Sequence, residues 1–378
     1  MLILHVITSL KDGGAEGVLY RLCTHDKMHS HVVISLMDEG KYGPMLRSKG
    51  IEVITLGMRP NLPSPVALIK LIQLFRNYNP NVVQTWMLHA DLIGGIAARI
   101  ARRKAIIWGI RQTILEPGKS KITTIWIAKL LAKLSWWMPT LIAVCAHRAI
   151  DVHEALGYER AKMRYIPNGY NLAGFTRRLD EACTLRAQWD VGPNIPLIGT
   201  VGRYDPYKDY TNLLHALGLL RSRNISLLCV FVGTNLDSEN QEFLAQIQHL
   251  GLKETVMLFG RRTDIPAVMS ALDLHVLSSS AEAFPNVVAE AMACETPCVV
   301  TDVGDAAHIV GNTGWVVPPR DPEALANSIE KALSASQHDD WEKRCVLARK
   351  RIEEYFSIQR MVAEYSTLWH EAVTQCAD

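Results

Sequence analysis

The sequence contains no long uncharged apolar run and no strong net charge. No stretch of 18 apolar residues is free of charge, so we expect no membrane-spanning helix. The formal net charge is +2, which is too small to favour nucleic acid as a partner through bulk electrostatics. Hydrophobic residues make up 48% of the chain and charged residues 21%, which is the balance of a folded globular protein.

The usual signatures of disulfides and bound metals are also missing. The eight cysteines form no C-x-x-C pair and no zinc-like spacing. Most lie in apolar runs, such as Cys145 in LIAVCA and Cys229 in LLCVFV, which predicts reduced core thiols in a reducing compartment. No two aspartates are separated by a single residue, so the D-x-D motif with which many transferases hold a divalent ion is absent.

The N-terminus predicts a cytoplasmic protein. The opening residues MLILHVIT have neither the basic segment nor the small-residue cleavage site of an export signal. The apolar run is also too short for such a signal. We therefore expect it to form the first buried strand of the fold.

A length of 378 residues favours two domains, because single hydrophobic cores rarely grow so large. Both halves alternate apolar strand patterns with helical patterns, which is typical of parallel sheets covered by helices. Strands are expected in the first half at Leu2–Ile7, His31–Leu36, Glu52–Leu56, Val82–Thr85, Ala105–Gly109 and Thr140–Val144. In the second half they are expected near Pro196 and at Ser226–Val232, Val256–Phe259, Leu274–Leu277, Cys298–Thr301 and Gly314–Val317.

The predicted fold class is therefore α/β, with two Rossmann-like parallel-sheet domains facing each other across a cleft. We place the N-terminal domain at residues 1–180 and the C-terminal domain at 181–356. A final helical segment, 357–378, is expected to pack back on the N-terminal domain. The turn-rich stretch 168–194 predicts the linker. Ligands are expected at the carboxyl ends of the strands.

The first candidate loop, LKDGGAEGVLYRL, follows the first predicted strand. Gly13 and Gly14 let the backbone approach a ligand, and the next helix offers its N-terminal amides to an anion. The loop could be a dinucleotide fingerprint, with Asp38 on a ribose, but Asp12 stands where the first glycine should be. A tight turn that packs a helix on a strand is the alternative interpretation.

The second candidate loop, PLIGTVGRYDPYKDY, carries two cations after a predicted strand. Arg203 and Lys208 follow Gly202 closely enough to lie on one loop. Two such cations suit a diphosphate, whose negative charge grows as it leaves a sugar. Taken as isolated residues, such cations are more often solvated surface charges.

The third feature, SSSAEAFPNVVAEAMACETPCVV, is the most specific. Glu282 falls in the loop after the strand at Leu274–Leu277, and Glu290 falls inside the next helix, which is expected to begin near Pro285 and Asn286. The free amides of that helix would face a phosphate, while Glu290 could accept hydrogen bonds from ribose hydroxyls. Glu282 would be able to reach the sugar.

These residues resemble glycosyltransferase family 4, a family of retaining transferases with the two-domain GT-B fold. The resemblance spans nearly the whole chain through the GGAE loop, the VGR…K loop, the IPNG segment and the E-A-F-P-N-V-V-A-E motif. It implies that Gly14 backs the donor phosphate region, that Arg203 and Lys208 neutralise the diphosphate, that Glu282 lies by the transferred sugar and that Glu290 binds the ribose. It also implies that the donor is lined by the backbone of Phe284, Pro285 and Asn286.

The N-terminal half departs from the family pattern at one position. Many members carry a histidine after the strand that reads AIIWGIRQT here, and Arg111 stands in its place. His89, in QTWMLHADLIGG, follows the preceding strand and could serve near the sugar or the acceptor. A purely structural histidine at a helix start is an equal alternative. Asp91 and Arg111 are further candidates for the acceptor side.

Lysines and tryptophans surround an apolar helical pattern at Gly118–Pro139. Lys119, Lys121, Lys129 and Lys133 accompany Trp126, Trp136 and Trp137. This combination suits the headgroup region of an anionic membrane. A helix buried in the domain with its lysines reaching out to solvent is the alternative. We therefore hypothesise a peripheral membrane contact through Lys119–Trp137, on the inner face of the membrane.

Together these features predict a retaining, metal-independent glycosyltransferase without a cofactor. Its substrate would be a nucleotide-diphosphate sugar, with a UDP-sugar favoured, and its acceptor a glycan or polyprenyl-linked glycan of a surface polysaccharide or glycoconjugate. Three alternatives are weighed against this function. They are a sugar-nucleotide epimerase of the same fold, a nicotinamide oxidoreductase, and an inactive nucleotide-binding scaffold of a glycan-assembly complex.

Overall fold

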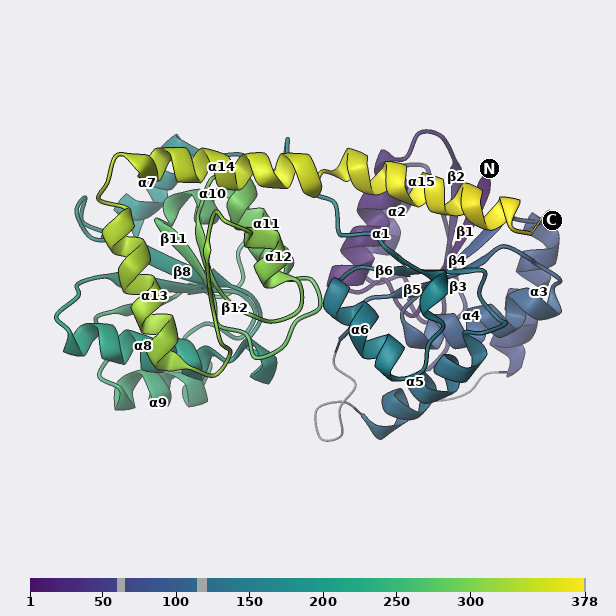
Figure 1. Cartoon of the computed structure of the whole chain (residues 1–378), viewed down its shortest axis with the longest axis horizontal. Coiled ribbons are helices and arrows are strands. Elements are labelled where there is room, and N and C mark those ends of the chain that lie inside the picture. Colours follow the sequence, from purple (N-terminus) through teal and green to yellow (C-terminus); the bar gives the residue numbers. More distant parts are fainter. Residues whose placement is uncertain (60–64, 114–120, 377–378) are drawn as a thin grey trace. The chain divides into compact units, whose positions relative to one another are not determined.

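The computed structural model describes residues 1–59, 65–113 and 121–376 (Figure 1). The chain divides into two compact units. The first contains Met1–Gly169 and Ile358–Asp378, and the second contains Tyr170–Ser357. Residues 170–180, which the sequence analysis groups with the N-terminal domain, thus belong to the second unit, and the C-terminal helix belongs to the first.

The first unit is built on a seven-stranded parallel sheet in the order β3-β2-β1-β4-β5-β6-β7. Its strands are β1 (Leu2–Ile7), β2 (Ser30–Ser35), β3 (Glu52–Thr55), β4 (Val82–Trp86), β5 (Ile106–Ile110), β6 (Leu141–Val144) and β7 (Met163–Tyr165). Its helices are α1 (Gly14–His25), α2 (Tyr42–Arg47), α3 (Pro65–Tyr78), α4 (Leu88–Ile100), α5 (Ile122–Leu134), α6 (His147–Ala155), the 3₁₀ turn η1 (Arg160–Lys162) and the C-terminal α15 (Ile358–Thr374).

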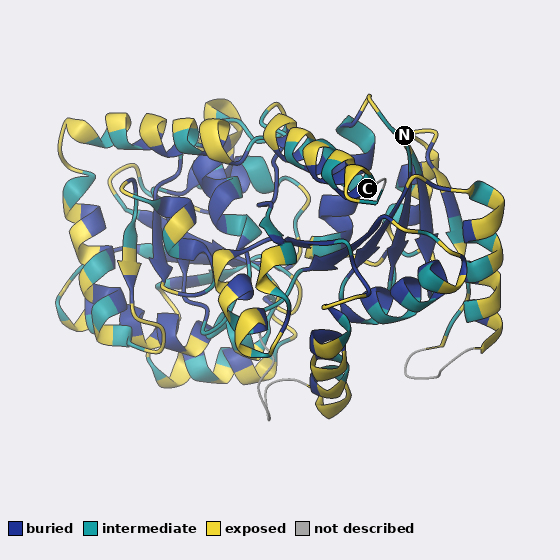
Figure 2. Cartoon of the chain, turned by 45° about the vertical axis from the view of Figure 1, so that its right-hand side comes forward, coloured by how far each residue is buried: buried dark blue, intermediate teal, exposed yellow. Residues whose placement is uncertain are grey.

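Helices cover this sheet, so its central strands are buried rather than alternating between core and solvent. β4 and β5 have every residue buried (Figure 2). The C-terminal helix α15 packs against α1, β4 and β5. It inserts Tyr365 and Trp369 into the core beside the central strands, and both side chains are almost completely buried.

The second unit contains a six-stranded parallel sheet in the order β10-β9-β8-β11-β12-β13. Its strands are β8 (Leu197–Val201), β9 (Leu228–Val232), β10 (Val256–Leu258), β11 (Leu274–Leu277), β12 (Cys298–Thr301) and β13 (Trp315–Val317). Its helices are α7 (Leu179–Gln188), the 3₁₀ turn η2 (Pro206–Lys208), α8 (Tyr210–Ser222), α9 (Gln241–His249), α10 (Ile265–Ala271), α11 (Asn286–Ala293), α12 (Ala306–Val310), α13 (Pro322–Ala335) and α14 (Asp340–Tyr355).

The structure confirms the α/β class with two Rossmann-like parallel sheets and corrects three local predictions. The predicted linker 168–194 is too long, because α7 lies inside it and buries Ala182 and Leu185. The short edge strand β7 was not predicted. The sequence predicts helix from Pro322 to the end with one interruption near Ser334–Asp339, and the structure has a second break at Ser357, between α14 and α15.

The described helices include none that has both the length and the apolar character needed to cross a bilayer.

Candidate active site

In each sheet the strand order changes direction beside its central strand, and this places two loops next to each other. In the second unit β8 lies between β9 and β11, so the chain leaves β8 toward one side of the sheet and β11 toward the other. Such a switch point opens a crevice at the carboxyl ends of the strands, where open α/β sheets bind ligands. The loop with Arg203 and Lys208 follows β8, and the loop with Glu282 follows β11.

The structure joins these two loops through a direct ion pair. Lys208 Nζ donates a hydrogen bond of 2.6 Å to Glu282 Oε1, and the two side chains are only 20% and 16% exposed. Ser279 Oγ donates to the same carboxylate oxygen at 2.8 Å. The Glu282 carboxylate is therefore held in one orientation by a cation and a hydroxyl, which is the kind of fixed geometry a ligand site requires.

Further hydrogen bonds fix the loops that carry this pair. Ser278 Oγ donates to Lys208 O at 2.9 Å, and Ser280 N donates to Tyr207 O at 2.8 Å. The next loop approaches from β12, where Asp305 N donates to Ala283 O at 2.9 Å. At Gly304 the backbone has a φ of +53°, and a Cβ there would lie 2.2 Å from Ala283 O. Only glycine permits this approach without strain.

Arg203 lies on the same loop as Lys208 but has a different environment. Its side chain is 69% exposed, and its Nε donates a 3.2 Å hydrogen bond to Asp205 Oδ2. The structure thus brings Lys208 and Glu282 together and leaves the Arg203 guanidinium largely in solvent. An exposed arginine can still reach a diphosphate, because its side chain is long and its charge is permanent.

The remaining motif residues surround the start of α11. Phe284 and Pro285 are buried just before the helix, and Asn286 is its first residue. The N-cap residue is Pro285, whose side chain cannot cap the helix, and Val288 N donates to Pro285 O at 3.1 Å. Glu290 follows about one turn further on and is partly buried.

In the first unit the equivalent switch point lies between β1 and β4. Gly14 begins α1 after β1, and its backbone is exposed. His89 lies at the start of α4 after β4 and is partly buried. Burial and the nearby charge of Lys121 lower the pKa of His89, so its imidazole is neutral at pH 7 and can accept a hydrogen bond or a proton.

Asp91 has an environment that the sequence did not indicate. Its side chain is buried, and the residue is 1% exposed. Asp91 Oδ1 accepts hydrogen bonds from Thr85 Oγ1 at 2.6 Å and from Gly109 N at 3.2 Å. Burial raises the pKa of this carboxyl to about 8, against the opposing effect of those two hydrogen bonds. The buried Asp91 thus links β4 to β5 through Thr85 and Gly109, and its assignment to the acceptor side stays a prediction.

Arg111 is likewise tied into the first unit. Nη1 donates to Asn168 Oδ1 at 2.7 Å, and Nη2 donates to the Tyr365 hydroxyl. The guanidinium also lies over the Trp86 ring, 4.7 Å from its centroid. Arg111 therefore connects the end of β5 to the IPNG segment and to α15.

A chain of buried polar side chains crosses the core of the first unit, and no motif in the sequence indicates it. Trp86 Nε1 lies 3.2 Å from His5 Nδ1, and His5 Nε2 lies 3.0 Å from His31 Nδ1. His31 Nε2 lies 3.2 Å from Asp26 Oδ2. One tautomer set satisfies every contact, with Trp86 donating to His5, His5 to His31 and His31 to Asp26.

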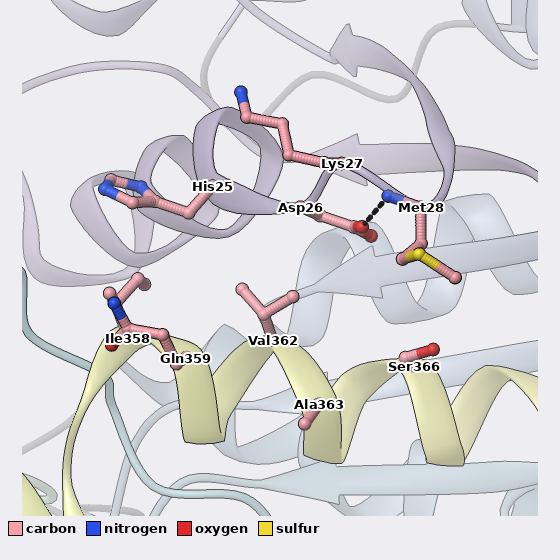
Figure 3. Close-up of a pocket in the computed structure, with 9 residues that line it drawn as sticks. All are labelled: His25, Asp26, Lys27, Met28, Ile358, Gln359, Val362, Ala363 and Ser366. Carbon is pink, nitrogen blue, oxygen red and sulfur yellow. Dashed lines mark hydrogen bonds between the residues drawn. The ribbon is translucent and has the colours of Figure 1, made fainter.

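Asp26 also accepts hydrogen bonds from Met28 N at 2.7 Å and from His29 Nδ1 at 2.9 Å. Figure 3 shows the first of these at the wall of a cavity of about 480 Å³ between the end of α1 and α15. Burial raises the pKa of Asp26, but the hydrogen bonds from His31, Met28 and His29 outweigh that effect and bring the pKa to about 2. Cys23 lies close enough to His5 and His31 to form a potential metal-ligand group, but ligation through His5 Nε2 would require a protonated Nδ1, which would oppose the Trp86 N–H.

The structure places the lysine- and tryptophan-rich segment on the surface. α5 buries one face through Ile125, Ala128, Leu131 and Ala132. Large apolar side chains on its other face and just beyond its end are exposed: Ile122, Trp126, Leu130, Trp136 and Trp137. Lys121, Lys129 and Lys133 are exposed beside them, whereas Lys119 lies outside the described residues. The expected lipid-facing residues are thus solvent-accessible, which does not by itself show a membrane.

The fold and the loop geometry define a class before any comparison is made. Two parallel sheets, each with a switch point beside its central strand, are the architecture of doubly wound nucleotide-binding domains. Comparison with known protein families finds a match for each of the two units. Residues 12–173 match the family described as Glycosyltransferase Family 4, and residues 184–350 match the family described as Glycosyl transferases group 1.

Several known proteins resemble the chain over most of its length. It is 24% identical over 319 residues to the UDP-Gal:α-D-GlcNAc-diphosphoundecaprenol α-1,3-galactosyltransferase of Escherichia coli, covering 81% of this chain and 79% of that protein. It is 26% identical over 315 residues to the capsular polysaccharide biosynthesis glycosyltransferase CapM of Staphylococcus aureus, covering 80% of each. The solved structure of HepE from Anabaena with UDP-glucose has a TM-score of 0.82 at 25% identity, covering 97% of this chain and 98% of that one.

This chain therefore belongs to glycosyltransferase family 4, with the GT-B fold. Membership confirms the family expected from the motifs and disfavours the nicotinamide oxidoreductase, in agreement with the broken glycine fingerprint at Asp12. It does not assign the individual site residues.

Proposed function

We propose that the chain transfers a sugar from a UDP-sugar to a glycan or lipid-linked acceptor, with retention of configuration and without a metal ion. The observation that carries the proposal is the Lys208–Glu282 pair beside the N-terminus of α11. A lysine and the first amides of a helix supply positive charge for a diphosphate without a divalent ion. The UDP-glucose complex of HepE and the UDP-Gal donor in the name of the Escherichia coli relative support the choice of UDP.

The residue roles follow from the placement of each side chain. Lys208 and Arg203 would stabilise the departing diphosphate, and Glu282 would contact the transferred sugar. Glu290 would bind the ribose, while Phe284, Pro285 and Asn286 would line the donor. On the first unit, Gly14 would back the phosphate region, and His89 would serve near the sugar or acceptor with the neutral imidazole that its lowered pKa provides.

The proposed chemistry needs no separate protein base. The acceptor hydroxyl attacks the anomeric carbon on the face from which the diphosphate departs, and the C–O bond to the diphosphate breaks. In this step the leaving phosphate oxygen takes the acceptor proton, so that the transfer is complete without a protein base. Stabilising the charge that develops on the leaving group is the largest contribution we assign to the protein.

The test is a donor-hydrolysis screen. The purified protein is incubated with a panel of UDP-, GDP- and ADP-sugars in the presence of EDTA, and released nucleoside diphosphate is quantified. Release from one UDP-sugar that is lost in Glu290→Ala supports the proposal and identifies the sugar. Release only from another nucleotide sugar, or only after a divalent ion is added, contradicts it. Conversion of the donor to an epimer would instead support the epimerase alternative.

We also propose that the exposed face of α5 contacts an anionic membrane. The support is its exposed tryptophans and lysines, together with the absence of any acidic residue from 117 to 150 in the sequence. The double variant Trp126→Ser/Lys129→Ser should reduce co-sedimentation with vesicles of mixed zwitterionic and anionic phospholipids at low salt. The control, Lys343→Ser/Val346→Ser on the exposed face of α14, should bind as the wild type does. Failure of the wild type to co-sediment would end this proposal.

A further inference from the structure

The C-terminal ends of α5 and α6 form a hollow on the surface of the first unit. It has a volume of about 640 Å³, and its lining includes Lys129, Lys133 and Trp136 on the α5 side and Ala155 and Gly157 on the α6 side. Trp136 Nε1 donates a 3.3 Å hydrogen bond to Gly157 O. The hydrogen bond connects the two sides, so the hollow has an aromatic edge beside two lysines.

The two lysines carry positive charges that no carboxylate neutralises. Lys129 and Lys133 are about one helical turn apart, so their side chains leave the same face of α5, and both are exposed. Neither has a hydrogen-bond or ion-pair partner in the part of the chain that the structure describes. The residues that line the hollow include no acidic one, and Glu154 of α6 pairs instead with Arg160 at 3.5 Å. The hollow is therefore complementary in charge to an anion.

The carbonyl groups at the ends of the two helices are engaged in hydrogen bonds. Free carbonyls at a helix C-terminus carry partial negative charge and would repel an anion. Lys162 Nζ donates to three carbonyl oxygens at the end of α5, those of Ser135, Trp136 and Pro139. The backbone N–H groups of residues 156–158 donate to carbonyl oxygens in the last turn of α6. These bonds lessen the repulsion that an anion in the hollow would meet.

The surface around the hollow is apolar as well as basic. Trp126, Leu130 and Trp137 are exposed, and helical spacing puts them on the face of α5 that carries the lysines. An inorganic anion would gain nothing from such a surface. A phospholipid presents a phosphate and an apolar interior together, which matches lysines beside exposed tryptophans.

The hollow lies at the opposite edge of the sheet from the candidate active site. α5 ends shortly before β6 begins, and α6 ends shortly before β7, so both helices end at the amino edge of the sheet. His89 follows β4 at the carboxyl edge. The 13 residues of α5 span about 20 Å, roughly the distance between the two edges. A ligand in the hollow would thus be held away from the reacting groups.

We propose that this hollow binds the phosphate of an anionic phospholipid. Lys129 and Lys133 contact the phosphate oxygens, and Trp136 lies at the level of the lipid headgroups. The bound lipid is an anchor and not a substrate, because the hollow is on the edge of the sheet away from His89. The inference rests on the proposed membrane contact of α5, and it specifies the lipid class and the residues that recognise it.

The first test fills the hollow without changing its charge. Ala155 is exposed at the end of α6, and Ala155→Phe would place a ring in the hollow. Co-sedimentation of the full-length protein is measured with vesicles of phosphatidylcholine and phosphatidylglycerol, and with phosphatidylcholine alone. An added phenylalanine by itself strengthens binding to a bilayer. A loss of about fivefold on the mixed vesicles, with no loss on phosphatidylcholine, is therefore expected only if the hollow holds the anionic headgroup.

The second test compares two lysines of the same segment. Lys133→Gln should weaken partitioning to the mixed vesicles by more than about tenfold, because a charged hydrogen bond to a phosphate is lost. The matched control is Lys121→Gln at the other end of α5, which removes the same charge from an exposed residue outside the hollow. Its effect should stay below about fivefold, as for a lysine that is merely near a charged surface.

The outcomes separate this inference from the membrane contact on which it rests. Thermal unfolding first shows that each variant is folded, and the lysine pair remains informative if Ala155→Phe is not. Wild-type binding by Ala155→Phe, or equal losses in Lys133→Gln and Lys121→Gln, would mean diffuse attraction and would overturn the hollow while leaving the membrane contact. Absence of binding by the wild type would overturn both.

Discussion

Lys208 and Glu282, which are 74 residues apart in the sequence, form a 2.6 Å ion pair across the loops that follow β8 and β11. The pair is largely shielded, so each partner stabilises the charge of the other more strongly than a surface pair would. A donor diphosphate would compete with Glu282 for the lysine. This arrangement leaves Glu282 available to the sugar once Lys208 turns to the phosphate.

Removing Lys208 should therefore impair turnover more than folding. Lys208→Ala is expected to lower kcat by about a hundredfold or more, because the charge on the leaving diphosphate loses its cation. Lys208→Arg should recover part of the activity, since it restores the charge with a different geometry. The measurement is release of nucleoside diphosphate under saturating donor. Near-normal turnover in Lys208→Ala would contradict the assignment of the diphosphate site.

Arg203 permits a sharper separation of activity from stability. Its side chain is 69% exposed, and its partner Asp205 is two residues away, so Arg203→Ala should change the free energy of unfolding by less than about 0.5 kcal/mol. If Arg203 binds the diphosphate, turnover should nevertheless fall on the order of a hundredfold. Steady-state kinetics and urea unfolding of the same preparation test both statements. An unchanged turnover would assign Arg203 to the solvated surface.

Asp91 should make stability fall with rising pH. Burial raises its pKa to about 8, so the folded state keeps a proton that the unfolded chain releases near pH 4. The contribution of protonated Asp91 to the free energy of unfolding is therefore complete below about pH 4 and is lost as the pH rises through 8. Asp91→Asn imitates the protonated side chain and should be more stable than the wild type at pH 8.5 by on the order of 1–3 kcal/mol.

Urea unfolding at pH 6 and pH 8.5 measures this difference. The exposed Asp151→Asn is the control, since it should shift stability equally at both pH values. If Asp91→Asn loses as much stability between the two pH values as the wild type does, the carboxyl is ionised in the fold and the prediction is wrong.

Asp26 should have the opposite effect to Asp91, so that its contribution to the free energy of unfolding is lost as the pH falls. Hydrogen bonds from His31, Met28 and His29 outweigh burial and bring its pKa to about 2, below the ordinary value of 3.8. Its contribution is therefore present above about pH 4 and is lost as the pH falls toward 2. Asp26→Asn should cost about 2 kcal/mol at pH 7, and the difference from the wild type should narrow as the pH is lowered from 5 to 3.

The matched control is Asp38→Asn. Asp38 carries a similar charge but is half exposed, and it contacts Lys11 at 3.7 Å, so the substitution should change stability by less than about 0.5 kcal/mol. If Asp26→Asn and Asp38→Asn shift the unfolding midpoint equally, the hydrogen bonds of Asp26 with the buried histidines do not stabilise the fold and the prediction is wrong.

The sequence predicted the elements whose patterns are strong and local. β1, β11 and β12 have the predicted bounds, because each is a short apolar run between clear turn signals. β7 was missed because its three residues, at the edge of the sheet, include Arg164 and are only partly buried. α7 was mistaken for linker since its charged residues hide a short apolar face.

The candidate site was predicted in part for a related reason. The motif residues were found because family 4 keeps them in recognisable strings, and the strand order then brought Lys208 to Glu282. Their supporting residues gave no such signal. Ser279, Tyr170 and Asp26 are ordinary residue types, and no motif marks them. Tyr170 meets Asn286 across 116 residues. Ser279 and Asp26 have partners nearby in the sequence, but these contacts depend on how the local chain folds.

The sequence alone thus determined the α/β class, the two sheets, the family and the residues of the donor motifs, because these depend on apolar periodicity and on short strings. Only the tertiary structure decided that Asp91 is buried and neutral, that Arg111 connects Asn168 to Tyr365, and that Tyr170 holds Asn286. The physical reason is that a side chain's charge state and partners depend on which strands and helices lie beside it. That arrangement follows from packing across the whole unit and cannot be deduced from neighbouring residues.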